Sequence, residues 1–535
     1  MAQETLDIAV VGAGVSGAYS AWRLAEAGKR VGLFEYSGRV GGRLYSYTFD
    51  ELPNVHAELG GMRFIPKEHE VVTGLVAELD LATQPFPMGA PPAVSGENNI
   101  MHLRGRLFRA RDFADPDKVP YAVNTVERGM NPDQLQAYVM DSLFPNAASM
   151  KQKEWFNAQA FGKPLYQIGF WNLLYRVLSS EAFFLMSDGG GYYTNVANSN
   201  AVSSLPTNEF APSIVYATLK QGYQQLPIAL AERFEAAAPG GLRRNHRLVS
   251  VERDGDGPYR LVFVRTKSLP DGNTVDVAPR ATVEVTATRV VLAMPRRSLE
   301  LVDWAPLQTR GKVRDDLLRS IIIQAAFKLF LVYPYPWWRA LGVQAGRSIT
   351  DMPIRQTFYF GTEGEQPGGD DTNLASLMMA SYNDLGSVSF WKALEAGDKF
   401  SPPELALRAA EEGEDAVANA HWLPTRQMVE QAQEQIRTLH GVEYVPDPIA
   451  ARYQDWTRDP YGGGWHAWKA GYPYWDVMER MRKPDPKQEV YVCGEAYSNN
   501  QGWVEGALQV AERMLEDHFG LPRPGWIPHE YDLGP

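Results

Sequence analysis

The feature that most constrains the fold of this chain is a glycine-rich turn, GAGVSG at residues 12–17, set between two regular segments. Residues 6–11 are apolar and β-rich, as in a buried strand. Residues 15–27 have a helical pattern that Gly28 ends, and residues 30–35 resume as strand. This order predicts a βαβ unit whose helix N-terminus can face a bound phosphate.

An acidic residue ends the second strand of that unit. Glu35 lies 35 − 17 = 18 residues after the last glycine of the turn, where a carboxylate can hold ribose hydroxyl groups. A glycine turn alone fits many loops, but the turn and Glu35 together predict a dinucleotide site without a 2′-phosphate, which the carboxylate would repel. The expected contacts are Gly12, Gly14, Val15, Ser16, Gly17, Glu35 and Tyr36.

A second motif, RVGGR at residues 39–43, brings two arginines and flexible backbone to the same region. Together with the turn and Glu35 it resembles the flavin-containing amine oxidase superfamily, and the resemblance implies FAD as the cofactor. It extends to Gly494-Glu495 and to GWVEGA at residues 502–507, and more weakly to Leu248, which is equally well an ordinary strand residue. The further flavin contacts it implies are Arg39, Gly42, Arg43, Leu248, Gly494, Glu495, Gly502, Trp503, Val504 and Ala507.

The segment ELGGMRF at residues 58–64 is similar to the L-amino-acid oxidases, most of all the bacterial ones. The resemblance implies that Gly60, Gly61, Met62 and Arg63 contact the flavin and that Arg63 grips the substrate α-carboxylate. A planar guanidinium suits that task because it makes two parallel charge-assisted hydrogen bonds to a carboxylate. A structural salt bridge is the alternative for Arg63.

Lys328 lies within the apolar run AAFKLF at residues 325–330. An unpaired buried ammonium is costly, so the lysine requires a specific partner or a shifted pKa. The alternative is a lysine that extends to solvent at a strand end. By resemblance, Lys328 is expected to act in catalysis with Arg63, by holding a water molecule near flavin N5.

Further pocket residues are expected on two other segments. In IRQTFYF, residues 354–360, alternation favours Tyr359 over Phe358 as a second contact to the α-carboxylate. Trp465 occupies the position where some amine oxidases bond the flavin through cysteine, which implies a non-covalent flavin. Trp465, Gly502 and Trp503 are expected to contact substrate, and the side-chain pocket is expected around Trp171, residues 187–193 and Trp465.

The expected architecture is mixed α/β, with a Rossmann-like FAD-binding domain, a β-sheet substrate domain and a helical insertion. The FAD-binding domain is assigned to residues 1–66, 220–300 and 485–535, and the substrate domain to residues 67–117 and 301–484. Residues 118–219 are mainly helical in pattern and form the insertion.

Composition excludes several other classes of function. With 52 Lys and Arg against 64 Asp and Glu, the net charge is −12, which disfavours nucleic acids and anionic membrane surfaces as partners. The sequence shows no metal-binding spacing of Cys and His, no membrane-spanning stretch and no secretory signal, so a cytoplasmic location and no metal are expected. The expected partners are an L-amino acid and O2, and a homo-oligomer is compatible with the sequence.

The expected activity is oxidative deamination of L-amino acids to 2-oxo acids, ammonia and hydrogen peroxide, by hydride transfer to flavin N5. One alternative is a flavin monooxygenase that decarboxylates the amino acid to an amide. Another is a polyamine or monoamine oxidase, which would have no use for the charge of Arg63. A non-catalytic flavin-binding protein is the alternative outside the enzymes.

Overall fold

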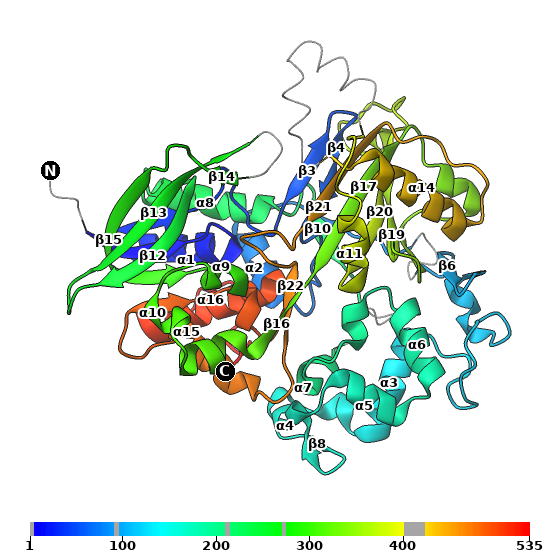
Figure 1. The fold of residues 1–535 in the computed structure, drawn as a ribbon, viewed down its shortest axis with the longest axis horizontal. Coiled ribbons are helices and arrows are strands. Elements are labelled where there is room, and N and C mark those ends of the chain that lie inside the picture. Colours follow the sequence, from blue (N-terminus) through cyan, green and yellow to red (C-terminus); the bar gives the residue numbers. More distant parts are fainter. Residues whose placement is uncertain (1–4, 90–95, 208, 210–213, 270–273, 401–422) are drawn as a thin grey trace.

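The computed structural model describes residues 5–89, 96–207, 209, 214–269, 274–400 and 423–535. Figure 1 shows two β-sheets with flanking helices and a separate group of helices below the second sheet. The mixed α/β class predicted from the sequence is confirmed. None of the described helices is long and apolar enough to cross a membrane.

The first sheet has eight strands in the order β11-β2-β1-β15-β13-β12, with β14 beside β13 and β23 beside β15. Strands β2, β1, β15, β11 and β23 run parallel. Strand β13 pairs antiparallel with β15, and β12 and β14 each pair antiparallel with β13. The bounds are β1 Leu6–Val11, β2 Val31–Phe34, β11 Leu242–Arg243, β12 His246–Arg253, β13 Tyr259–Ser268, β14 Thr274–Asp276, β15 Thr282–Leu292 and β23 Val490–Val492. The sheet is therefore assembled from three stretches that are far apart in the sequence.

Three helices cover the glycine-turn side of this sheet: α1 (Val15–Glu26), α8 (Gln225–Ala237) and α16 (Val504–Phe519). Their apolar faces share one buried cluster with β1 and β2, which includes Leu24, Leu230 and Leu515. Burial of these faces against the sheet is the main stabilising contribution, at roughly 25 cal/mol per Å² of apolar surface removed from water. The packing fixes the N-termini of α1 and α16 near the carboxyl ends of the parallel strands.

The second sheet has seven strands in the order β21-β17-β20-β19-β18-β6-β7. One face packs on α14 (Arg426–His440), and the other packs on the β3–β4 hairpin. Strand β17 is buried along its whole length, which explains why its sequence is apolar except at Lys328. The bounds are β3 Ser46–Phe49, β4 Leu52–Glu58, β6 Ile100–Leu103, β7 Arg106–Arg109, β17 Ala326–Tyr333, β18 Gly346–Thr350, β19 Gln356–Thr362, β20 Ser376–Asp384 and β21 Ala450–Asp455.

The group of helices at the lower right of Figure 1 comes from the predicted insertion. The helix α3 begins with a capping box, in which Asn131 and Gln134 satisfy each other's backbone N–H groups, and packs on α5 and α6. The helices are α3 Pro132–Leu143, α4 Gln152–Phe156, α5 Phe170–Val177, α6 Ser180–Gly189 and α7 Ala201–Ser204. The division of the chain into domains stays a prediction.

Shorter elements connect these three parts. Strand β16 (Ile321–Gln324) pairs with β22 (Trp465–Trp468) between the two sheets. The remaining helices and strands are α2 Glu70–Glu78, β5 Thr83–Pro85, β8 Gln159–Ala160, β9 Lys163–Pro164, β10 Ala217–Leu219, α9 Arg296–Glu300, α10 Ala305–Gln308, α11 Gly386–Lys392 and α15 Tyr474–Arg482.

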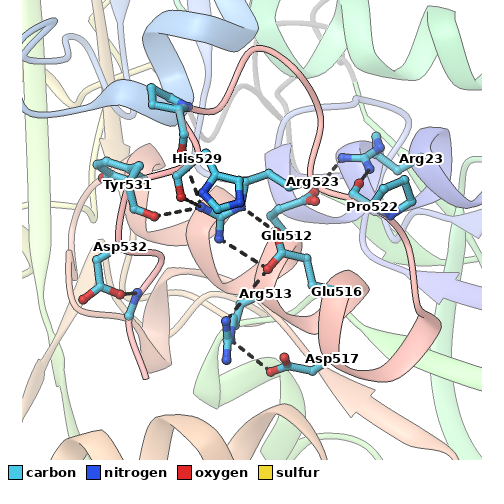
Figure 2. Close-up of polar contacts among 12 residues, drawn as sticks. Arg23, Glu512, Arg513, Glu516, Asp517, Pro522, Arg523, His529, Tyr531 and Asp532 are labelled. Carbon is cyan, nitrogen blue, oxygen red and sulfur yellow. Dashed lines mark hydrogen bonds and ion pairs between the residues drawn. The ribbon is translucent and has the colours of Figure 1, made fainter.

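The segment after α16 is held in place by arginines, as Figure 2 shows. Arg523 donates to Glu516 on α16 at 2.8 Å and to the Tyr531 carbonyl at 2.9 Å. Arg23 of α1 donates to Glu512 of α16 and to the Pro522 carbonyl, both at 2.7 Å. These contacts connect the segment to both helices that border the glycine turn.

Candidate functional site

The glycine turn follows β1 and meets the chain that leaves β15. Because both strands are parallel neighbours, their carboxyl ends lie together at one edge of the sheet. Gly12 has φ +104°, and a Cβ there would lie 2.5 Å from the Ala293 carbonyl oxygen. A Cβ on Gly17 would lie 1.8 Å from the Gly12 carbonyl oxygen. Glycine is required at both positions for this close approach.

A cavity opens at this edge, and we call it the nucleotide cavity. Its walls come from the turn, from the second motif and from the last strand and helix. The predicted cofactor residues that line it are Gly12, Gly14, Val15, Ser16, Glu35, Tyr36, Gly42, Arg43, Gly61, Leu248, Gly494, Glu495, Gly502, Trp503, Val504 and Ala507. The structure thus brings together residues from both ends of the chain.

Glu35 is buried at the end of β2 and is fixed by hydrogen bonds. One carboxylate oxygen accepts from the Ala13 backbone N–H at 2.7 Å, and the other accepts from the Ser37 backbone N–H at 3.0 Å. The carboxylate is therefore anchored to the glycine turn and held at the cavity wall. This position suits a group that accepts hydrogen bonds from ribose hydroxyls.

The two arginines of the second motif have different surroundings. Arg39 does not line the nucleotide cavity. It donates to the Gly42 and Leu44 carbonyls, both at 2.7 Å, and lies 4.2 Å from the Tyr45 ring centroid. Its guanidinium therefore holds the loop in shape. Arg43 does line the cavity, where it donates to Glu495 at 2.7 Å.

Glu495 has several donors around it. Burial alone would raise the pKa of Glu495, but Arg43 and His466 hold that pKa well below its ordinary value. The carboxylate also accepts from the backbone N–H of His466 at 2.9 Å and from that of Gly502 at 3.2 Å. Glu495 is thus a permanent anion that ties the second motif to β22 and to the turn before α16.

Sequence reasoning missed part of the cavity wall. Residues 293–295, which follow β15, line it, as do Pro460 and Tyr461. The first group could have been found, because a strand parallel to β1 must end at the same edge of the sheet. The second group carries no comparable signal in the sequence.

A second cavity, of about 600 Å³, adjoins the first, and we call it the adjoining cavity. Gly61, Gly502, Trp503 and Val504 line both cavities, so the two spaces share a wall. The predicted residues Gly60, Met62, Arg63 and Trp465 line only this second cavity. The site therefore has a part for a dinucleotide and a part for a smaller molecule.

Arg63 is 5% exposed and is surrounded by aromatic rings. Its guanidinium carbon lies 4.1 Å from the Tyr216 ring centroid, 5.4 Å from that of Phe86 and 5.9 Å from that of Phe358. Stacking on rings holds a guanidinium in place. Its Nη1 also donates to the Met88 sulfur at 3.3 Å. Arg63 is therefore positioned as an anion-binding group at the cavity wall.

Lys328 is 2% exposed, so it does not extend to solvent. Its Nζ donates to the carbonyls of Glu58 at 2.9 Å and Gly60 at 2.6 Å, and lies 4.4 Å from the Tyr382 ring centroid. Burial lowers the pKa of Lys328 to about 7; nearby Glu58 opposes the shift and Arg63 adds to it. Lys328 thus holds the backbone next to Gly61, and its expected contact with a water molecule stays a prediction.

Replacing Lys328 with Met should change how stability depends on pH. The folded-state pKa of about 7 lies below the ordinary 10.5, so between these values only the unfolded chain binds the proton. Wild-type stability therefore rises with pH across this window relative to Lys328→Met, by at most about 1.4 kcal/mol per pH unit. Denaturant unfolding of both proteins at pH 7, 8 and 9 measures the difference, and parallel pH profiles would contradict it. Exposed Lys220→Met is the control.

The structure contradicts the expectation for Tyr359. Its hydroxyl donates to Ser348 at 2.7 Å and lies 2.7 Å from Nε2 of His440, on the α14 face of the sheet. Phe358 instead faces Arg63. Alternation gave the wrong face because nothing in the sequence of β19 shows which face carries the cavity.

Tyr382 of β20 is the tyrosine that lines the adjoining cavity from this sheet. Its ring is nearly perpendicular to those of Tyr192 and Trp465, with centroids 5.0 and 6.4 Å away. Tyr382 pairs with Lys328 across strands β20 and β17, but the sequence alone does not reveal this register.

Tyr359→Phe should lower stability and leave catalysis intact. The change removes the buried contacts of the hydroxyl with Ser348 Oγ and with His440 Nε2, which costs about 1–3 kcal/mol, while the adjoining cavity is unchanged. Melting temperature and kcat/KM on an L-amino acid measure the two effects. Tyr382→Phe is the matched variant, and it should lower kcat/KM by roughly tenfold, because Tyr382 lines the adjoining cavity and loses its polar group. The opposite pattern would restore Tyr359 to the site.

Trp171 also lies elsewhere than expected. Its side chain is 42% exposed and its ring stacks on that of Tyr175, 6.0 Å away on the same helix. It does not line the adjoining cavity, whereas Tyr192 and Trp465 do.

Among the described residues, no group of three His, Cys, Asp or Glu could hold a metal ion.

Comparisons with known proteins all find amine or amino-acid oxidoreductases and their relatives. The family model for flavin containing amine oxidoreductase matches residues 15–515. The chain is 32% identical to aplysianin-A of Aplysia kurodai, over 96% of this chain and 90% of the relative. It is 28% identical to achacin of Lissachatina fulica, over 96% and 93%, and 26% identical to an L-amino-acid oxidase of Mus musculus, over 98% and 73%. A solved structure of putrescine oxidase bound to putrescine shares the fold, with TM-score 0.66, 17% identity and coverage of 97% of this chain and 100% of that one.

Proposed function

The chain belongs to the family of flavin-containing amine oxidoreductases, and from this premise we propose that it is an FAD-dependent L-amino-acid oxidase. The reaction is oxidative deamination of an L-amino acid to a 2-oxo acid and ammonia, with O2 reduced to hydrogen peroxide. Relatives named L-amino-acid oxidase from a mammal and from snakes support this activity over nearly the whole chain.

One observation carries the choice of substrate: Arg63 lines the adjoining cavity beside the wall that this cavity shares with the nucleotide cavity. A cationic fork fixed among aromatic rings suits a carboxylate, which it can bind through two parallel hydrogen bonds. A simple amine would gain nothing from Arg63. The position therefore favours amino acids over polyamines.

The residues of the nucleotide cavity fit a dinucleotide. Besides the close approaches at Gly12 and Gly17, a Cβ on Gly14 would meet no protein atom closer than 4.0 Å, so the space beside its backbone is open. The N-terminus of α1 points into that space and suits a pyrophosphate, and Glu35 suits a ribose. Because the chain belongs to a family of flavin-containing enzymes, we propose that this dinucleotide is FAD.

We expect the flavin to be held without a covalent bond. Trp465 stands where a tethering cysteine would be expected by resemblance. The only cysteine, Cys493, is buried in the core beside Ser20, and burial raises the pKa of its thiol to about 12. Such a thiol is unreactive.

When bound, FAD supplies the acceptor for the hydride that leaves the substrate Cα. The chain's own residues position the substrate for this step: Arg63 fixes the α-carboxylate and Tyr382 and Trp465 form walls around the Cα. Fixing the reacting atoms in place supplies much of the acceleration in such a reaction. Lys328 keeps the Gly60–Gly61 backbone, which borders both cavities, in position.

The test is to record the visible spectrum of the purified protein without oxygen while L-amino acids, their D-enantiomers and polyamines are added. Bleaching by L-amino acids alone supports the proposal. Bleaching by polyamines alone would contradict the role of Arg63, and no bleaching by any compound would favour a non-catalytic flavin protein. Product analysis under air then separates a 2-oxo acid from the amide that a monooxygenase would form.

A further inference from the structure

We propose that the adjoining cavity selects L-amino acids with a cationic side chain, which is recognised by the carboxylate of Asp133 with Glu209 beside it. The inference rests on the proposed function and extends it to the class of substrate.

Asp133 lies in the first turn of α3, and its side chain lines the adjoining cavity. The capping box formed by Asn131 and Gln134 fixes this turn, so the carboxylate has a rigid support. Within the part of the chain that the structure describes, the Asp133 carboxylate has no hydrogen bond or ion pair. Asp133 is half-buried, and a carboxylate without a partner in such a place is ready to accept a cation.

The charges that face the cavity are unequal. The acidic residues of its lining are Glu68, Asp133 and Glu209, of which Glu68 is exposed and lies at the protein surface. The basic residue of the lining is Arg63. The two lining histidines stay neutral, because burial lowers the pKa of His69 to about 4 and also lowers that of His466.

Substrate binding increases this imbalance. Once the α-carboxylate occupies Arg63, the interior of the cavity holds two carboxylates and no compensating cation from the lining. An ammonium or guanidinium on the substrate side chain would restore the balance, whereas an apolar side chain would leave both half-buried carboxylates without a counter-ion. Burial raises the pKa of Asp133 to about 6, with Arg347 opposing and Glu209 adding, so the site gains from a bound cation.

The rest of the wall is also unsuited to an apolar side chain. Hydroxyl and amide groups line the cavity on the side of the helical insertion, at Gln136, Thr194, Asn195, Ser199, Ser203 and Thr207. Such groups can accept hydrogen bonds from a guanidinium or an ammonium. An aliphatic side chain would displace water from them without replacing its hydrogen bonds.

A dicarboxylic amino acid is the main competing substrate class, since Arg347 lies near Asp133. However, Arg347 does not line the cavity, and its Nη1 donates to Gln356 at 2.7 Å and to the Gly190 carbonyl at 3.2 Å. Its guanidinium is committed to the protein. The carboxylates, and not the guanidinium, face the substrate space.

The experiment compares L-lysine with L-norleucine, which has the same chain without the ammonium, and includes L-arginine and L-glutamate. We expect wild type to show kcat/KM at least about tenfold higher for L-lysine than for L-norleucine. Asp133→Asn should lower kcat/KM for L-lysine by roughly 30-fold, and the ratio of kcat/KM for L-lysine to that for L-norleucine should fall at least as far. Asp141→Asn, an exposed carboxylate on the same helix, is the control and should change neither.

Wild type that prefers L-norleucine or L-glutamate to L-lysine would overturn the inference, and so would an unchanged lysine-to-norleucine ratio in Asp133→Asn. The wild-type ratio tests the inference even if the variant does not fold. Either of these results leaves the oxidase activity in place, whereas the absence of turnover with every amino acid would remove the proposed function itself.

Discussion

Arg63→Lys is expected to lower kcat/KM for L-amino acids by roughly 100- to 1,000-fold while the protein stays folded and yellow. Lysine keeps the positive charge but loses the planar fork, so one of two charge-assisted hydrogen bonds to the α-carboxylate is lost and the substrate is misaligned. The surrounding rings of Tyr216, Phe86 and Phe358 fit a flat cation and cannot hold an ammonium in the same place.

Steady-state kinetics on an L-amino acid, with the flavin spectrum and melting temperature measured in parallel, test this expectation. Arg128→Lys is a suitable control, because Arg128 is exposed and lies outside both cavities. Unchanged kinetics in Arg63→Lys would remove Arg63 from the substrate site. A variant that loses its flavin would instead show that Arg63 serves the cofactor.

Gly17→Ala is expected to give a protein with less than about a tenth of the wild-type flavin and a clearly lower melting temperature. The new methyl group would lie 1.8 Å from the Gly12 carbonyl oxygen, so α1 must move away from the turn. Overpacking of this kind costs typically about 1–3 kcal/mol, and here it also displaces the N-terminus that faces the nucleotide cavity.

The measurement is the ratio of flavin to protein absorbance after purification, together with thermal unfolding. Gly525→Ala is the matched control, because a Cβ at Gly525 would meet no atom within 4 Å. Full flavin content in Gly17→Ala would show that the turn tolerates a displacement of α1 and is not the tight phosphate-binding turn inferred from the sequence.

The nucleotide half of the site was predictable because its signals are local. A strand, a glycine turn, a helix and Glu35 follow one another within thirty residues, so their geometry is set by short-range backbone constraints. Lys328 was also detectable, since a charge within an apolar run requires an explanation. Arg39 shows the limit of motif reasoning, because its guanidinium turns back to carbonyls of its own loop.

The substrate half depends on contacts between distant segments, and there the sequence was less informative. Tyr382 and Tyr359 lie on neighbouring strands, and only the register of the sheet decides which of them faces the cavity. Asp133 lies on α3 of the insertion, and its place in the site follows from how α3 packs on α5 and α6 and how α6 contacts β6 and β18 of the second sheet, not from any local pattern. The same packing leaves Trp171 on the outside.

The first sheet is complete only when β23 joins β15, and the walls of the nucleotide cavity are complete only with residues 494–507. A ribosome adds residues 494–507 some 480 residues after it has made the glycine turn. During that time β15 lacks its partner β23 and α1 lacks its neighbour α16. Such contacts between distant segments form late in folding. The complete wall of the nucleotide cavity therefore exists only after residues 494–507 have been made and have packed against the earlier part of the chain.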